Sequence, residues 1–211
     1  MRGLGACAHG LPLGECTSPG CPIWLADPRG RKPWVTGWAL SRYSGGGPHD
    51  TRLGSLVHDI KYGKTPLDER QAMADEIAER MMGFISEVYE LPRLPFSVCV
   101  APPSHQPKPF ELAHHLCEEV AAGFGLIDAS GRLHERHPVR SMKEIPDAEE
   151  RRKILNEAIT VDRPNSGRSP RGFLVVDDVF ESGATMGAVC EALRRVFPRS
   201  QFHVLAATCR Y

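Results

Sequence analysis

The chain has 211 residues, of which 26 are basic and 26 are acidic. This length can bury one full α/β core with a small appendage, and the balanced charge excludes a global field that would recruit nucleic acid or an anionic membrane. There is no apolar run of about 18 residues, and the N-terminus lacks the apolar core of a signal peptide. We therefore expect a cytoplasmic protein without membrane insertion.

Residues 1–33 form the first predicted unit, a cysteine-rich module that precedes a main domain over 34–211. The segment shows no apolar periodicity and is too small to bury a core of its own. Cys7, His9, Cys16 and Cys21 could supply the thiolate and imidazole ligands of a closed, structural Zn²⁺ site that folds the segment. Their spacing differs from a pair of Cys-x₂-Cys motifs, so a docked arm with three reduced cysteines is the open alternative.

The main domain alternates predicted strands and helices. Continuous apolar runs predict buried strands, and apolar residues at helical spacing predict helices. In chain order these are strand 34–43, helix 53–60, helix 68–90, strand 96–101, helix 113–124, helix 146–155, strand 158–161, strand 173–176, helix 186–196 and strand 202–208. The order predicts an α/β fold with a mostly parallel sheet flanked by helices, and residues 126–145 are predicted to be irregular and basic.

The most informative stretch begins with the apolar strand 173–176 and continues into Asp177 and Asp178. Open α/β sheets bind their ligands at the carboxyl ends of strands, where these acids are expected. A run of small residues over 182–185 then leads into a helix, whose N-terminus favours a phosphate. Acids for sugar hydroxyls beside a phosphate loop predict a sugar-phosphate site. The alternative is an ordinary strand–turn–helix with a solvated acidic turn.

This run resembles the phosphoribosyl pyrophosphate (PRPP) motif of type I phosphoribosyltransferases, and the resemblance implies that fold with a small hood over the site. It implies that Asp177 and Asp178 are the catalytic acids, which hold the ribose hydroxyls directly or through Mg²⁺. It also implies a loop around the 5′-phosphate, made of Glu181, Ser182, Gly183, Ala184 and Thr185. Glu181 departs from the family pattern, where a hydroxyl or small residue is more common.

The same resemblance places a pyrophosphate loop after the first core strand. Here that loop contains Pro103 and Ser104, with Lys108 just beyond. Arg140 and Lys143 lie where such folds carry a mobile basic loop over the active site. A solvated basic face is the alternative interpretation of these two residues.

A narrower resemblance rests on the run Ile60-Lys61-Tyr62-Gly63 and on the cysteine-rich N-terminus. Together with the acidic motif, these features resemble the ComF family of competence-associated, phosphoribosyltransferase-like proteins. That resemblance implies an N-terminal zinc module and places Lys61 among the phosphate-binding residues. The Arg-Gly-Phe-Asn-Gln sequence that usually follows the pyrophosphate loop is absent here, and residues 106–111 stand in its place.

Two functions follow from these resemblances. The first is an enzyme that transfers phosphoribose from PRPP to an unknown acceptor with Mg²⁺. The second is a non-catalytic, ComF-type regulatory protein of DNA uptake or processing, with single-stranded DNA or DNA-processing proteins as partners and the PRPP site as a sensor or relic. The acids and Thr185 favour retained ligand binding, whereas Glu181 and the altered loop favour the second function.

Overall fold

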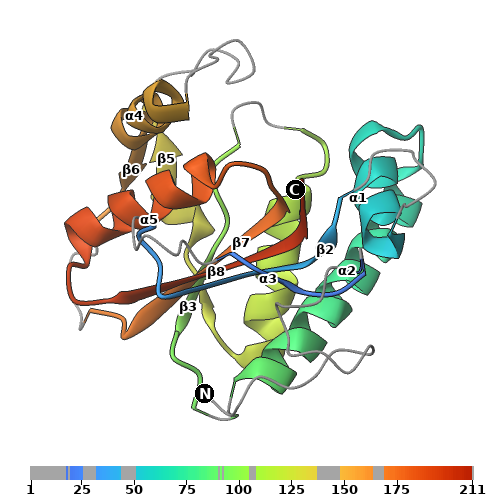
Figure 1. Cartoon of the computed structure of the whole chain (residues 1–211), viewed down its shortest axis with the longest axis horizontal. Coiled ribbons are helices and arrows are strands. Elements are labelled where there is room, and N and C mark those ends of the chain that lie inside the picture. The colour runs from blue at the N-terminus through green and yellow to red at the C-terminus, as the bar shows by residue number, and fades with distance from the viewer. Residues whose placement is uncertain are drawn as a thin grey trace.

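A six-stranded sheet with helices on both faces forms the centre of the molecule (Figure 1). The computed structural model describes residues 18, 20–25, 32–43, 51–89, 91, 93–104, 108–136, 148–163 and 169–210, and only the backbone at 148, 149, 151 and 152. Its strands are β1 Ile23–Trp24, β2 Thr36–Arg42, β3 Val98–Val100, β4 Ile127–Asp128, β5 Leu133–Glu135, β6 Ile159–Val161, β7 Gly172–Phe180 and β8 Gln201–Cys209. Its helices are α1 Arg52–Tyr62, α2 Leu67–Val88, α3 Leu112–Phe124, α4 Ala148–Ala158 and α5 Ala184–Val196, with a short 3₁₀ turn η1 at Ser130–Arg132.

The strand order in the sheet is β1-β2-β8-β7-β3-β4. Four of the five neighbouring pairs are parallel, and β1 runs antiparallel to β2 at one edge. The predicted α/β fold with a mostly parallel sheet is therefore confirmed. Strand β1 precedes residue 33, so a piece of the N-terminal segment is part of the central sheet.

Strand β7 is apolar without alternation because helices cover both of its faces. Leu174 and Val176 join the core that α1, α2 and α3 form on one side of the sheet. Phe173 and Val175 join the core that α5 and Leu155 form on the other side. Such burial on both faces is the usual state of a central strand in a parallel sheet.

The structure departs most from the predicted elements at the end of β7 and over residues 126–145. Strand β7 does not end before the acids but continues through Asp177 and Asp178 to Phe180, because the neighbouring β8 pairs with it as far as Cys209. The stretch 126–145, predicted to be irregular, contains β4, η1 and β5. These elements have two or three residues each, which is too short to give a periodic pattern.

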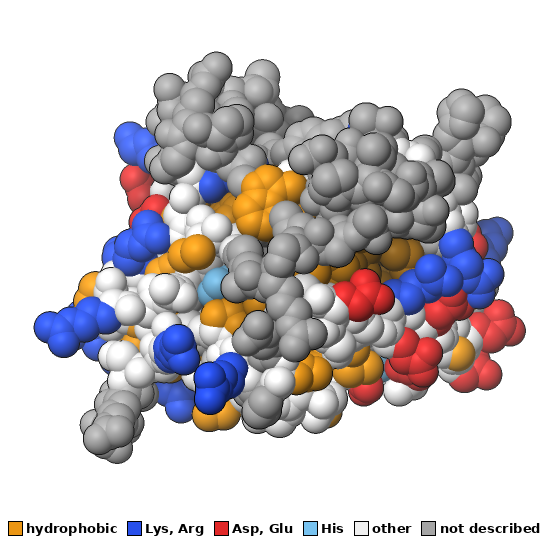
Figure 2. Space-filling model, turned by 60° about the horizontal axis from the view of Figure 1, so that its bottom comes forward, with side chains coloured by type: hydrophobic (Ala, Val, Ile, Leu, Met, Phe, Trp, Pro, Cys, Tyr) orange, Lys and Arg blue, Asp and Glu red, His pale blue; other side chains and the backbone are white. Residues whose placement is uncertain are grey.

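Charge is mixed over the surface. On the face shown in Figure 2, Lys and Arg lie on both sides and Asp and Glu gather mainly on the right, so no single sign covers that face. Among the described residues, no helix combines the length and apolar character that crossing a membrane requires.

Candidate functional site

Two cavities open at the carboxyl end of β7. The smaller has a volume of about 130 Å³ and is lined by the residues from Val179 to Met186, by Asp177 and by Leu155 of α4. The larger has a volume of about 430 Å³ and lies between the ends of α1 and α3. Both cavities have Asp177 and Thr185 in their walls. Asp177 is therefore shared by the two cavities, whereas Asp178 lines only the larger one.

The wall of the smaller cavity is the loop that leads from β7 into α5. Gly183 has a φ of 76°, and a Cβ at this position would lie 2.7 Å from Cζ of Phe180, so the turn requires glycine. Helix α5 begins at the next residue, and no side chain caps it from the N-cap position. Ser182 Oγ accepts a hydrogen bond from the Ala184 amide at 3.3 Å. This loop thus presents the start of a 13-residue helix to the cavity, an arrangement that suits a phosphate.

Glu181 lies on the rim of both cavities. Its side chain is 68% exposed, and its Oε1 lies 4.0 Å from Nη1 of Arg210, which follows β8. The arginine offsets part of the glutamate's charge. Exposure and this neighbour reduce the repulsion that Glu181 would exert on a phosphate.

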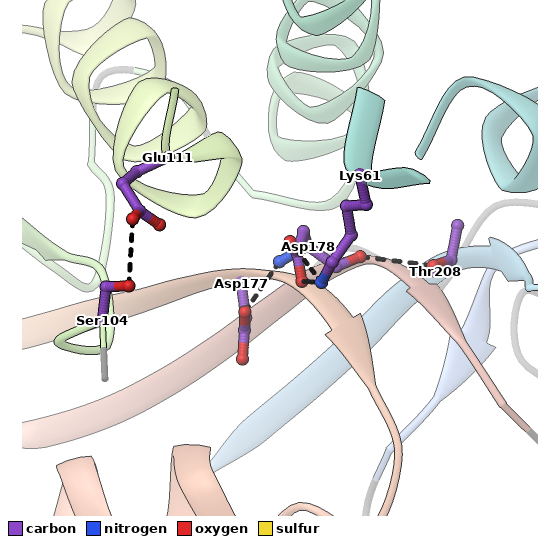
Figure 3. A network of polar contacts seen from close by, with 6 residues as sticks. All are labelled: Lys61, Ser104, Glu111, Asp177, Asp178 and Thr208. Atoms are coloured by element: carbon purple, nitrogen blue, oxygen red, sulfur yellow. Dashed lines mark hydrogen bonds and ion pairs between the residues drawn. The ribbon is translucent and has the colours of Figure 1, made fainter. Parts of the chain in front are cut away.

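Lys61, at the end of α1, binds the second acid directly. Its Nζ donates hydrogen bonds to both carboxylate oxygens of Asp178, at 3.0 and 2.8 Å (Figure 3). The Asp178 amide donates to Oδ1 of Asp177 at 2.8 Å. Thr208 Oγ1, on β8, donates to the Asp178 carbonyl at 3.2 Å. Groups from α1 and β7 thus hold the two carboxylates, and β8 holds the backbone at Asp178.

Burial and neighbouring charges shift the pKa values of Asp177 and Lys61. Burial, and next the charge of Asp178, raise the pKa of Asp177 to about 8. The Asp177 side chain still reaches the cavity, where water moderates this shift. For Lys61, burial acts to lower the pKa, but the Asp178 carboxylate outweighs it and the pKa is raised. Burial thus favours the protonated form of Asp177, whereas the Asp178 carboxylate favours the charged form of Lys61.

The loop after β3 forms the opposite wall of the larger cavity. The Ala101 amide donates to Ser130 Oγ at 2.8 Å, and Nε2 of His114 lies 3.2 Å from the Pro102 carbonyl. Farther along, Ser104 Oγ donates to Oε1 of Glu111 at 3.0 Å. The loop is thus tied at three points to the turn before β5 and to the start of α3.

The structure brings together most of the predicted site residues. Those that line the two cavities are Lys61, Pro103, Ser104, Asp177, Asp178, Glu181, Ser182, Gly183, Ala184 and Thr185. Arg140 and Lys143 lie outside the described residues, as do Cys7, His9 and Cys16. Cys21 is buried just before β1. Ligand binding by any of these residues, and the zinc site, remain predictions.

Sequence reasoning did not assign a role to several cavity residues. Arg210 immediately follows the end of β8, so the rule that carboxyl ends of parallel strands share one edge could have identified it. Tyr62 is the last residue of α1, and Arg70 lies near the start of α2. Glu111 and His114 reach the cavity from the first turn of α3, and no sequence pattern pointed to them.

Metal-ligating groups occur at two places among the described residues. At the site, Asp177 and Asp178 supply carboxylate oxygens, but both oxygens of Asp178 are engaged by Lys61. These donors suit a cation that enters with a phosphorylated ligand rather than one bound by the protein alone. Away from the site, Asp75, His115 and Glu119 bring one ligand atom each within 4.8 Å of the others. There the imidazole and the Asp75 carboxylate already form an ion pair at 2.7 Å.

Comparison with known proteins does not identify a family for this chain. No family model matches the chain, and no curated protein matches it. Among solved structures, the crystal structure of a hypoxanthine phosphoribosyltransferase from Staphylococcus aureus is similar, with 11% sequence identity and a TM-score of 0.37. The match covers 64% of this chain and 62% of that one, which is less than two thirds of either. Function is therefore argued from the site.

Proposed function

We propose that this protein binds PRPP with Mg²⁺ and transfers its phosphoribose group to an acceptor, as a type I phosphoribosyltransferase-like protein. The observation that carries the proposal is that two adjacent cavities at the carboxyl end of β7 share a wall that includes Asp177, while Asp178 lines the larger one. A molecule with a phosphate at one end, a sugar in the middle and a pyrophosphate at the other end matches this order of subsites.

Each part of the ligand has a matching set of groups. The 5′-phosphate fits the smaller cavity, where α5 begins. The ribose hydroxyls fit Asp177 and Asp178, because carboxylates accept hydrogen bonds from hydroxyls. The pyrophosphate fits the larger cavity beside Ser104 and Lys108. An acceptor would enter the same large cavity from solvent.

The transfer itself is a substitution at ribose C1. The bond from C1 to the pyrophosphate oxygen breaks, and pyrophosphate leaves with the electron pair. A nucleophilic acceptor atom bonds to C1 and gives up its proton. The carboxylates of Asp177 and Asp178 lie where they stabilise positive charge on the ribose ring, and the donors near Ser104 stabilise the leaving group.

Mg²⁺ would be held by the phosphate oxygens of the ligand, with Asp177 and Asp178 as the nearest protein donors. When bound, it would neutralise part of the negative charge on the leaving pyrophosphate. Lys61 supplies a fixed positive charge at the same acids. It therefore lowers the charge that an entering cation has to balance.

A second candidate is the ComF-type alternative, a protein that binds PRPP as a signal and acts on DNA or on DNA-processing proteins. The observation that favours it is the direct pairing of Lys61 with Asp178, which engages both carboxylate oxygens of Asp178 until the pair opens. Turnover of an acceptor distinguishes the two candidates, because a sensor binds PRPP without consuming it.

Calorimetric titration of PRPP, with and without Mg²⁺, tests the proposal. We expect saturable binding that strengthens with Mg²⁺ and disappears in the double variant Asp177→Asn, Asp178→Asn. The matched control is Asp162→Asn, an exposed acid outside both cavities. No saturable binding by the wild-type protein, or unchanged binding by the double variant, would overturn the assignment.

A further inference from the structure

Glu111 holds an unusual position at the start of α3. It is the N-cap residue, with an extended backbone (φ −109°, ψ 98°), yet its side chain does not cap its own helix. Instead, the carboxylate turns back toward the loop after β3. There Oε1 accepts hydrogen bonds from the Lys108 amide at 2.7 Å and from Ser104 Oγ at 3.0 Å (Figure 3).

The donors that hold Glu111 are of the kind that hold phosphates in proteins. A backbone amide and a hydroxyl converge on one anionic oxygen, and the start of a helix lies beside it. Ser104, Lys108 and Glu111 all line the larger cavity. The Glu111 carboxylate thus occupies an anion-binding position in the larger cavity, where we propose that pyrophosphate binds.

A similar arrangement exists at the acids, with the opposite charge. Lys61 Nζ contacts both oxygens of Asp178, on the opposite wall of the same cavity. In Figure 3, Lys61 points in from α1, and Glu111 points toward Ser104 from α3. The unliganded cavity thus has an internal cation at its acidic end and an internal anion at its loop.

We propose that Glu111 is an internal competitor for the pyrophosphate subsite, so that a ligand anion binds only by displacing its carboxylate from Ser104 and the Lys108 amide. This inference rests on the proposed function, because it assumes that pyrophosphate enters the larger cavity. Glu111 is then a residue that sets affinity rather than one that performs chemistry.

The competition has a direct physical consequence. A ligand must replace two hydrogen bonds to a carboxylate and then lie near the displaced negative charge, and both effects weaken binding. The same effects favour departure of pyrophosphate, since the carboxylate returns to its donors when the anion leaves. Glu111 therefore favours low affinity and ready release at this subsite.

The variant Glu111→Gln tests this role by the sign of its effect. Glutamine keeps an oxygen that accepts from Ser104 and Lys108 but carries no charge. We expect inorganic pyrophosphate with Mg²⁺ to bind about tenfold more tightly to this variant, because the two hydrogen bonds that compete with it are no longer charge-assisted. The matched control is Glu118→Gln, which removes the same charge from an exposed position on α3 and should leave the affinity unchanged.

Glu111→Ala separates competition from a structural role. The alanine variant lacks both the charge and the acceptor, so a competitor predicts tighter pyrophosphate binding here too. If Glu111 only shapes the loop, the affinity for pyrophosphate should fall in Glu111→Ala and stay the same in Glu111→Gln. That result would overturn the proposal. Thermal melting of both variants establishes that they are folded before titration.

The failure of this inference is distinguishable from the failure of the proposed function. If the wild-type protein binds PRPP but neither Glu111 variant binds pyrophosphate more tightly, the role of Glu111 alone is wrong. If neither the wild-type protein nor the variants bind PRPP or pyrophosphate, both proposals are wrong. If the wild-type protein binds PRPP and binding of pyrophosphate is detected only after Glu111→Gln, both proposals are supported, because the carboxylate then competes for the subsite.

Discussion

Lys61 Nζ lies 2.8 Å from Oδ2 and 3.0 Å from Oδ1 of Asp178, although 117 positions separate the two residues in the chain. The pair joins the end of α1 to the end of β7 and is mostly removed from solvent, with side-chain exposures of 26% and 13%. Because water screens it poorly, this contact contributes more than an exposed ion pair does. It links the helices over one face of the sheet to the acids of the site.

Replacing the lysine should therefore destabilise the protein. Lys61→Met keeps most of the apolar stem but leaves the Asp178 carboxylate partly buried without its partner. We expect a loss of about 1–3 kcal/mol in the free energy of unfolding, measured by urea denaturation. The matched comparison is Arg52→Met, which breaks an ion pair to Glu76 in which the arginine is 66% exposed. That change should cost much less, because water screens an exposed pair, and equal losses in the two variants would show that the Lys61 pair behaves as a surface pair.

The central part of the fold could be predicted because local and tertiary preferences agree there. The apolar run before Asp177 has to be covered on both faces, and the apolar residues of α5 repeat at helical spacing. Together they predicted a buried strand, a loop and a helix in the right order. The position of Asp177 and Asp178 near a phosphate-type loop followed from that order alone.

The remaining parts depend on contacts between distant segments. The length of β7 is set by β8, which pairs with it beyond the acids. The role of Glu111 comes from a backward turn to Ser104 and Lys108, which no periodicity encodes. β4 and β5 are stabilised by pairing with β3 and β6 rather than by their own sequences.

The pH dependence of stability should contain a contribution from His203 on β8. Its side chain is buried next to the Tyr89 and Phe96 rings, and Nδ1 lies 2.6 Å from Thr36 Oγ1. Burial lowers its pKa from 6.5 to about 4. Between these values the unfolded chain binds a proton that the folded protein does not, so stability is lost as the pH falls from about 6.5 to about 4.

The variant His203→Gln should remove this loss. Over the same pH window, the free energy of unfolding falls as the pH is lowered. The slope of this fall should be up to about 1.4 kcal/mol per pH unit larger for the wild-type protein than for the variant. Denaturation series at several pH values measure both slopes. The control is His134→Gln, which makes the same substitution at an exposed histidine. Parallel slopes for the wild-type protein and His203→Gln would contradict the prediction.

The predicted zinc site can be tested on the whole protein. We expect about one Zn²⁺ per chain by elemental analysis, lost together with thermal stability on Cys16→Ser, because a structural metal folds the segment that binds it. Cys190→Ala is the control for metal content. That cysteine lies on α5, is fully buried in the hydrophobic core and is not a predicted ligand. Metal-free wild-type protein with the same melting curve as the Cys16 variant would exclude the site.

Two glycines of the β7–α5 region offer a matched pair of substitutions. Gly183 has a φ of 76°, and an added Cβ would lie 2.7 Å from the Phe180 ring, so Gly183→Ala should cost about 1–3 kcal/mol and weaken phosphate binding by distorting the loop. Gly187 lies inside α5 with nothing within 4 Å of an added Cβ. Gly187→Ala should therefore stabilise the protein by about 0.5–1 kcal/mol, because alanine loses less backbone entropy in a helix. Denaturant unfolding and PRPP titration of both variants measure the two effects. If Gly183→Ala binds PRPP as tightly as Gly187→Ala does, then the left-handed turn at 183 does not shape the phosphate subsite.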